Sequence, residues 1–149
     1  SNRMNGKVFV ILLLVFTFGF AATLYYFQVF AFYYKSDGLK SIAVLDRNIA
    51  VQNYRGIDSA TSGLKLRGCF KVEPKEFTKI PRLLNATPLS APSWFSCFDH
   101  VKIQKAIDTG RAKAFLVSEN EKDGIDRVVA VYPDGTAFQW RQLNSKFLD

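Results

Sequence analysis

Histidine and cysteine are scarce in this chain of 149 residues, which contains one histidine, His100, and two cysteines, Cys69 and Cys97. A structural zinc site takes four nitrogen or sulfur ligands, commonly with C-x-x-C spacing, so the chain has too few. It also lacks a glycine-rich phosphate loop, an H-E-x-x-H pair and a nucleophile elbow. The sequence therefore predicts no cofactor and no metal site, and it names no reaction.

Runs of like charge are also missing, although the formal net charge is +7. Lysine and arginine are scattered among the acids, and no stretch of five or six like charges occurs. Basic and aromatic residues form no row of the kind that holds single-stranded nucleic acid. An excess of basic residues can also serve solubility or contact with anionic lipid, so we expect no nucleic-acid partner.

Charged residues are absent altogether from 8–34, a run of 27 residues. A helix rises about 1.5 Å per residue and the bilayer core is about 30 Å thick, so about 20 residues suffice to cross it. The run predicts a transmembrane helix over 8–34, with lipid as its surroundings. Tyrosines gather at its end, where amphipathic rings favour the headgroup layer: Tyr25, Tyr26, Tyr33 and Tyr34.

Two alternatives to a membrane anchor stay open. A signal peptide has an apolar region of about 7–15 residues before a small-residue cleavage site, and residues 19–21 before Ala22 would serve as one. Cleavage there would leave a chain that starts with apolar residues 22–34, which favours an uncleaved anchor. A buried core helix is the other alternative, but 27 uncharged residues exceed its usual length.

One face of the expected helix is aromatic, because Phe9, Phe16, Phe20 and Phe27 recur at intervals of seven, four and seven. This pattern suits lipid alone, or a face that packs on another membrane helix or on a flat pigment or quinone ring. Small residues four apart let helices approach closely. The residues that we expect to contact a membrane protein partner are Phe16, Gly19, Phe20, Thr23, Tyr26 and Phe27.

The two cysteines predict a disulfide, because an even pair in a membrane-tethered domain is typical of an oxidising compartment such as the periplasm. Closing a loop of about 28 residues would stabilise the fold by about 3–4 kcal/mol. Two buried free thiols are the alternative. Charges flanking the span do not decide its orientation, so the disulfide carries the expectation of a single-pass inner-membrane protein with a cytoplasmic tail, 1–7, and a periplasmic domain.

The remainder predicts an α+β domain over 41–149, after a linker over 35–40. Strands are expected at 42–45, 49–54, 64–70, 112–117, 127–132 and 136–143, with tight turns at 46–48 and 132–135. One short helix is expected within 74–84, and a second between the cap Asp99 and Gly110, its apolar face formed by Val101, Ile103, Ala106 and Ile107. Because strands and helices do not alternate, the sheet is expected to be mostly antiparallel.

Two features of the domain concern the cysteines. Alternation places Cys69 on the same face as Lys65 and Arg67, so a kink or bulge is expected at Gly68. Residues 88–98 form a proline-containing aromatic loop that a disulfide at Cys97 would hold against the strand. Trp94 and Phe95 are then either a lid on the core or an exposed docking patch for a partner or the membrane surface.

Three residues are candidates for acid and base chemistry. His100 beside Asp99 could form half of a dyad, although an imidazole at a helix start is more often exposed or bonded to the cap. Asp58 and Asp126 could act as a general acid and base, but each has an arginine within three residues, which favours ion pairing or turn capping. We therefore expect no catalytic residues and no enzyme.

Several stretches together resemble an alphaproteobacterial family of single-span membrane proteins of unknown function, found mainly in Rhodobacterales. The resemblance covers nearly the whole chain and implies no activity, cofactor or catalytic residue. The stretches that carry it are Met4-Asn5-Gly6-Lys7, Tyr25-Tyr26, Gln28-Val29, Ala31-Phe32-Tyr33, Arg55-Gly56-Ile57-Asp58, Leu66-Arg67-Gly68-Cys69-Phe70, residues 91–98, residues 124–131 and Pro133-Asp134-Gly135.

These observations predict a non-enzymatic accessory or assembly subunit of a larger respiratory or photosynthetic inner-membrane complex. It would dock through its span, with Trp94 and Phe95 as outside contacts. The alternative is an independent membrane-anchored sensory or ligand-binding domain with a cleft beside the Trp94 loop. An enzyme that uses Asp58, Asp126 or His100 is the third possibility.

Overall fold

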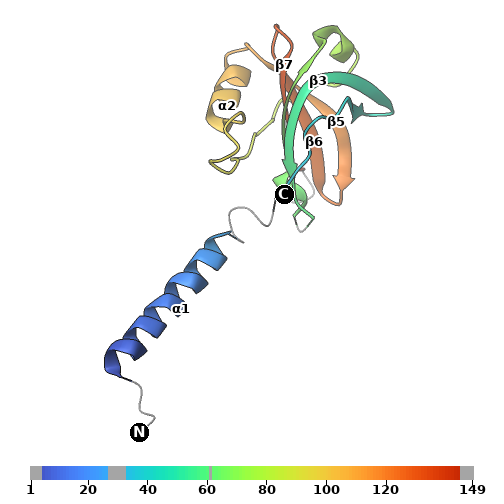
Figure 1. Ribbon diagram of the computed structural model, residues 1–149. Coiled ribbons are helices and arrows are strands. Elements are labelled where there is room, and N and C mark those ends of the chain that lie inside the picture. The colour runs from blue at the N-terminus through green and yellow to red at the C-terminus, as the bar shows by residue number, and fades with distance from the viewer. Residues whose placement is uncertain (1–4, 27–32, 61, 145–149) are drawn as a thin grey trace. The chain divides into compact units, whose positions relative to one another are not determined.

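The computed structural model describes residues 5–26, 33–60 and 62–144, and the chain divides into two units, Ser1–Phe32 and Tyr33–Asp149. The first unit holds helix α1, Gly6–Tyr26. The second holds a sheet with one further α-helix and is an α+β domain, as the sequence predicts. Figure 1 shows the elements of both units.

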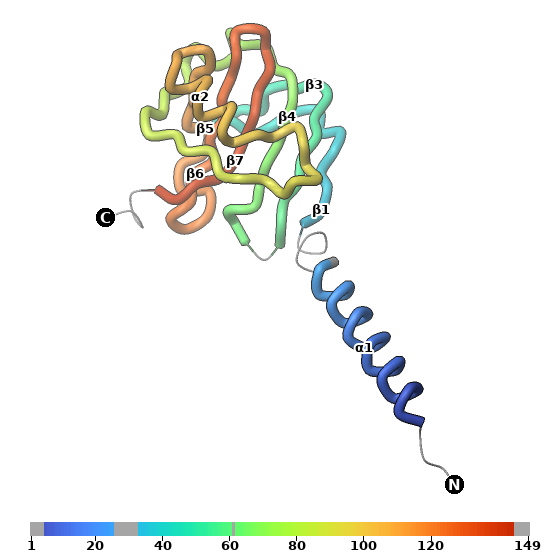
Figure 2. Tube along the Cα trace, turned by 90° about the vertical axis from the view of Figure 1, so that its left-hand side faces the viewer, coloured from blue at the N-terminus to red at the C-terminus, as the bar shows by residue number. Residues whose placement is uncertain are grey.

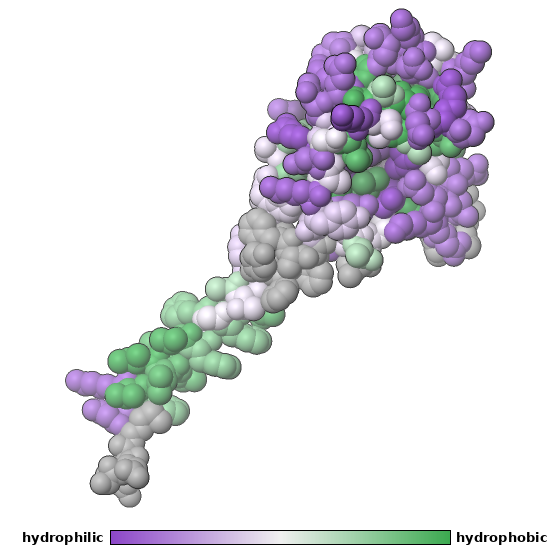
Figure 3. Space-filling view, turned by 45° about the vertical axis from the view of Figure 1, so that its right-hand side comes forward, coloured by the Kyte–Doolittle hydropathy of each residue, from purple (hydrophilic) through white to green (hydrophobic). Residues whose placement is uncertain are grey.

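Helix α1 is apolar on every side. Its residues are exposed from Gly6 to Tyr25, and the segment is long and apolar enough to cross a membrane. Figure 3 shows apolar side chains along it and mostly polar ones over the domain. A helix that is apolar all round is buried in protein or lipid, and none of this segment is buried in the protein. It therefore has the properties of a membrane anchor or a signal sequence.

The predicted boundary between helix and domain is too late. Residues 27–32 lie outside the described part of the chain, and Tyr34 belongs to strand β1, Tyr34–Lys35, which pairs with the end of β3, Arg47–Asp58. The predicted linker continues this pairing, because the amides of Ser36 and Gly38 donate to carbonyls of β3, each at 2.9 Å. The domain therefore begins at Tyr33.

The sheet is antiparallel throughout and runs in the order β1-β3-β4-β7-β6-β5, with β2, Ser41–Val44, also paired to β3. The other strands are β4, Arg67–Val72, β5, Lys113–Lys122, β6, Ile125–Val131, and β7, Thr136–Leu143. The sheet curls until the end of β2 meets β5, where the Leu45 amide donates to the Val117 carbonyl at 2.7 Å. This curling makes one face of the sheet the inside of a barrel-like core.

Each face of the sheet has its own core, so neither face of the central strands is in contact with water. The inner core includes Tyr54, Phe70, Val129 and Val131. The outer core includes Cys69, Ile103, Val128, Ala130 and Trp140. Helix α2, His100–Asp108, and the segment before it cover the outer core (Figures 1 and 2). Successive residues of β4 and β6 point to opposite faces of the sheet, and the residues on both faces are therefore buried.

The cap of helix α2 and the turn at 132–135 form as predicted. The Asp99 carboxylate caps α2 by accepting from the amides of Val101 and Lys102, and Gly110 follows the helix with φ +77°. The turn at 132–135 has the expected glycine, Gly135, at φ +91°. On α2, Ile103 and Ala106 are buried, but Val101 is 63% exposed, so its predicted place on the apolar face is wrong.

Three local predictions need correction. The first hairpin turns at residues 45–46, with Leu45 at φ +55°, one step earlier than predicted. Residues 74–84 form only the 3₁₀ helix η3, Pro74–Phe77. Residues 64 and 65, predicted as the start of a strand, belong to the 3₁₀ helix η2, Gly63–Lys65.

The bulge lies on β3 instead of at Gly68. From Gln52 to Arg55, β3 advances one residue more than β4, and Asn53 lies there at φ +55°. Gly68 keeps a regular register with β7. A Cβ at this position would lie 2.7 Å from the Tyr54 hydroxyl, so the close packing of Tyr54 accounts for the glycine.

Candidate functional site

The loop at 88–98 is fastened to β4 at two points. Cys97 forms a disulfide with Cys69, as predicted. Two residues earlier on β4, the Arg67 guanidinium donates to the carbonyls of Leu89 and Ser90 in the same loop. The loop is therefore a fixed part of the surface of the domain.

Arg67 is an arginine buried without a carboxylate among its hydrogen-bond partners. It is 5% exposed, and its Nη1 also donates to the carbonyls of Leu64 and Leu66, each at 2.6 Å. Burial lowers the pKa of Arg67 to about 10, so the side chain stays charged at neutral pH. Backbone carbonyls and the Phe98 ring, 5.7 Å away, take the place of a counter-ion.

The aromatic residues of the loop act mainly as a lid on the outer core. Phe95 is 9% exposed and Phe98 is 5% exposed. Trp94 is half-buried and packs edge-to-face on Tyr33, with ring centroids 5.8 Å apart. Of the two predicted outside contacts, Trp94 therefore keeps accessible surface and Phe95 keeps very little.

The predicted contact residues of the span lie on α1, except Phe27, which is outside the described residues. Phe16 and Phe20 are 71% and 59% exposed, and their rings stack at 6.2 Å. The Thr23 hydroxyl donates to the Gly19 carbonyl at 2.8 Å, so its hydrogen-bond donor is satisfied within the helix. Tyr26 is the last residue of the helix.

The structure does not assemble the acid and base candidates into one site. Asp58 pairs with Arg141 at 3.3 Å. The Asp126 carboxylate accepts from the Asn120 amide at 2.7 Å, which makes it a turn cap. His100 is the first residue of α2, after the cap. Within the described ranges, no group of three metal-ligating side chains occurs either.

Asp58 belongs to a chain of ion pairs that ends at Arg127. Glu121 joins Arg141 at 2.8 Å and Arg127 at 2.9 Å. Burial by itself raises the pKa of Glu121, but the hydrogen bonds and charges of the two arginines outweigh it and hold that pKa below its usual value. Arg127 also donates to Gln139 and to the Ala43 carbonyl of β2, so the ion pairs and these two bonds together link five strands, β2, β3, β5, β6 and β7.

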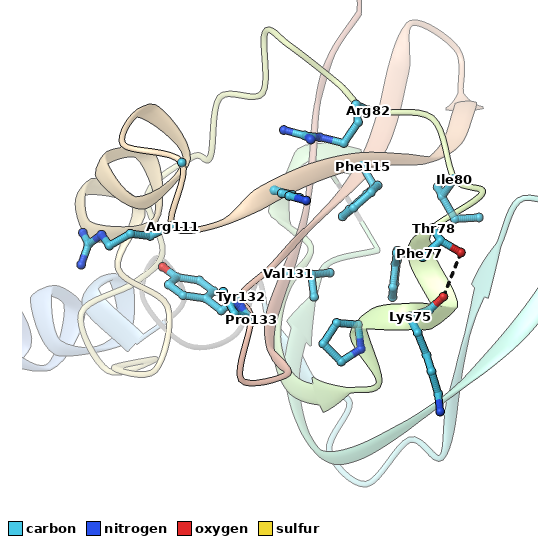
Figure 4. Close-up of a pocket in the computed structure, with 13 residues that line it drawn as sticks. Lys75, Phe77, Thr78, Ile80, Arg82, Arg111, Phe115, Val131, Tyr132 and Pro133 are labelled. Carbon is cyan, nitrogen blue, oxygen red and sulfur yellow. Dashed lines mark hydrogen bonds between the residues drawn. The ribbon is translucent and has the colours of Figure 1, made fainter.

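The domain has a hollow of about 560 Å³ with a basic rim (Figure 4). A second hollow, of about 570 Å³, lies over β3, β4 and β7 beside Cys97. The first hollow lies between η3, the start of β5 and the turn at 132–135. Its floor is apolar and its rim is basic. The residues used below are Phe77, Phe115 and Val131 from the floor, and Lys75, Arg82, Arg111, Lys113 and Tyr132 from the rim.

The rim cations have no acidic partners within the described residues. Lys75, Arg82, Arg111 and Lys113 are all exposed, and none forms an ion pair there. Arg82 lies over the Phe115 ring at 5.8 Å. Burial raises the pKa of Tyr132, so its hydroxyl stays protonated at neutral pH and can donate a hydrogen bond. The arrangement can bind a group that is both anionic and apolar.

The sequence did not point to this hollow. Its four cations come from two segments, 75–82 and 111–113, that are about 30 residues apart in the chain, and each is an ordinary surface residue when read alone. The only signal was the turn at 132–135, which was predicted for its geometry. The predicted cleft beside the Trp94 loop is a smaller hollow of about 150 Å³.

A family model matches residues 39–147, nearly all of the domain, and is described as a family of unknown function (DUF6446). Comparisons with curated proteins and with solved structures found no match.

Proposed function

The chain belongs to this family of unknown function, and from that premise we propose that it is a non-catalytic accessory or assembly subunit of a larger inner-membrane complex, respiratory or photosynthetic. Its span would be an uncleaved single-pass anchor with a cytoplasmic N-terminus, and its domain would face the periplasm. The proposal rests on the apolar helix α1, which is exposed on every side. It is supported by the domain, in which the two acidic candidates for catalysis, Asp58 and Asp126, form an ion pair and a turn cap.

The disulfide supports the periplasmic location. Structural disulfides persist in oxidising compartments and are rare in the cytosol. Residues 69 and 97 are joined in the domain, whose first described residue, Tyr33, follows the helix in the chain. An anchor with its N-terminus in the cytoplasm would deliver the domain to the side where this bond is stable.

Co-purification from native membranes tests the subunit proposal. The full chain is solubilised in mild detergent, run on a native gel, and its comigrating proteins are identified by mass spectrometry. We expect a stoichiometric membrane complex, lost on Gly19→Leu and Phe20→Ala. Phe18→Ala is the matched control, because Phe18 is 70% exposed but two residues from Phe20, on another side of the helix. A chain that runs alone contradicts the proposal.

The hollow favours a second candidate, an independent anchored ligand-binding or sensory domain. Its volume of about 560 Å³ lies within the range of small-molecule sites. This candidate predicts that a small molecule stays with the purified full chain in the absence of any protein partner. Mass spectrometry of the organic extract, compared with that of an Arg82→Glu/Arg111→Glu variant, distinguishes it from the first.

A further inference from the structure

We propose that the hollow is the docking site for an acidic segment of a partner protein, in which an apolar side chain lies between carboxylates. The inference rests on the proposed role as a subunit and adds to it a second contact, made by the domain. Three observations support it: the rim cations form no ion pairs in the described chain, the hollow has a shape that suits a protein segment, and the rim residues surround an apolar floor.

Charge complementarity indicates that the partner segment is negatively charged. On the sheet, Arg127 and Arg141 are each paired with carboxylates. The four rim cations have no such pairs in the described chain, and no acidic residue lines the hollow. Like charges gathered around one hollow repel each other and raise the local concentration of anions. A partner with carboxylates relieves that repulsion.

Shape favours a protein segment over an enclosed small ligand. The floor is already covered, since Phe77 is 1% exposed and Phe115 is 7% exposed. With the floor already covered, the accessible surface of the hollow lies mainly on its rim, which suits a segment that runs along the surface. A rim with arginine and tyrosine is typical of the residues that dominate protein–protein contacts. Tyr132 and Pro133 supply apolar surface that an incoming side chain can cover.

The placement of the rim residues predicts the pattern of the segment. In Figure 4, Arg111 and Lys75 extend from opposite ends of the hollow, and Arg82 lies along a third side above Phe115. The apolar floor lies between these cations. An extended segment therefore fits with an apolar side chain over the centre and carboxylates at both ends.

Site-specific crosslinking in the full chain, in its native membrane, tests the proposal. A benzophenone amino acid replaces Thr78, which is exposed and lines the hollow. The expected result is a crosslink to a protein segment with at least two acidic residues around an apolar one. The same probe at Glu119, an exposed position outside the hollow, is the control for proximity alone.

Charge reversal identifies the cause of the crosslink. We expect the double variant Arg82→Glu/Arg111→Glu to lower the yield at Thr78 by about tenfold, because two attractions become repulsions. Lys40→Glu/Lys105→Glu changes the net charge equally at exposed lysines outside the hollow and should leave the yield unchanged. Unchanged thermal melting of both variants excludes misfolding.

Four outcomes overturn the proposal: no protein crosslink at Thr78, a lipid or small-molecule adduct, a segment without acids, or a yield that survives charge reversal. Comigration is scored in the same membranes. A complex that comigrates without the Thr78 crosslink removes only this inference, whereas a chain that runs alone removes the subunit proposal itself.

Discussion

Arg67 and Cys69 lie two positions apart on β4 and fasten the same loop, the first through carbonyls and the second through a disulfide. Residues two apart on a strand share a face, so both side chains reach the outer side of the sheet. That side would be exposed without the loop. The loop and the two residues therefore depend on each other for their burial.

Breaking the disulfide should destabilise the domain by about 3–4 kcal/mol, the loop-closure value for residues 28 apart in sequence. Urea unfolding of the full chain in detergent, followed by tryptophan fluorescence with and without reductant, measures the difference. A Cys69→Ala/Cys97→Ala variant should have the same unfolding midpoint with and without reductant. Equal midpoints for the oxidised and reduced wild type would contradict the prediction.

Replacing Arg67 by lysine should cost about 2–4 kcal/mol, although the charge is kept. One ammonium group cannot serve the four carbonyls that the guanidinium fork reaches, so buried acceptors lose their donors. Arg55→Lys, at an exposed position on β3, is the control and should change the free energy of unfolding by less than about 0.5 kcal/mol. Similar losses in both variants would show that Arg67 has no special role.

Glu121 should make the free energy of unfolding of the domain depend on pH in the acid range. Its folded pKa lies below its usual value of 4.5, so the unfolded state binds more protons and stability falls as pH drops from about 4.5 through the lowered pKa. Glu121→Gln should lose about 1–3 kcal/mol at neutral pH, and its difference from wild type should shrink below that window. Unfolding measured across pH, with Glu119→Gln as the control, checks this. A constant difference would contradict it.

Gly135 should tolerate alanine less well than Gly38. Both have positive φ, +91° and +78°, so alanine is strained at either site. At Gly135 an added Cβ would also lie 2.6 Å from the Val72 carbonyl oxygen, whereas at Gly38 it meets nothing. We expect a loss of about 1–2 kcal/mol for Gly38→Ala and a clearly larger loss for Gly135→Ala in thermal melting. Equal losses would mean that the backbone shifts freely.

Much of the fold follows from local sequence signals. The turn at 132–135, the Asp99 cap and the strand at 136–143 each depend on signals within a few residues, and the structure has each where it was predicted. The disulfide followed from the number of cysteines in a tethered domain. These features do not depend on knowing which distant segment lies opposite.

The features that were missed depend on distant partners. Alternation placed Arg67 on one face of its strand with Lys65 and Cys69. The disulfide was predicted to hold the loop against that strand, but the hydrogen bonds from Arg67 to the carbonyls of Leu89 and Ser90 were not predicted. A bulge was predicted at Gly68 because alternation put Cys69 on the same face as two basic side chains, whereas the pairing of β3 with β4 puts the bulge at Asn53. The hollow needs the register of several segments before its cations come together.

The strand-like segment 34–40 shields the end of β3. Its amides donate to the carbonyls of Tyr54 and Gly56, which would otherwise face solvent. A soluble fragment that started at residue 41 would expose this edge, and exposed edges recruit strands from other chains. Such a fragment should self-associate, whereas one that starts at Tyr33 should stay monomeric. The few residues at the start of the domain thus protect it against aggregation.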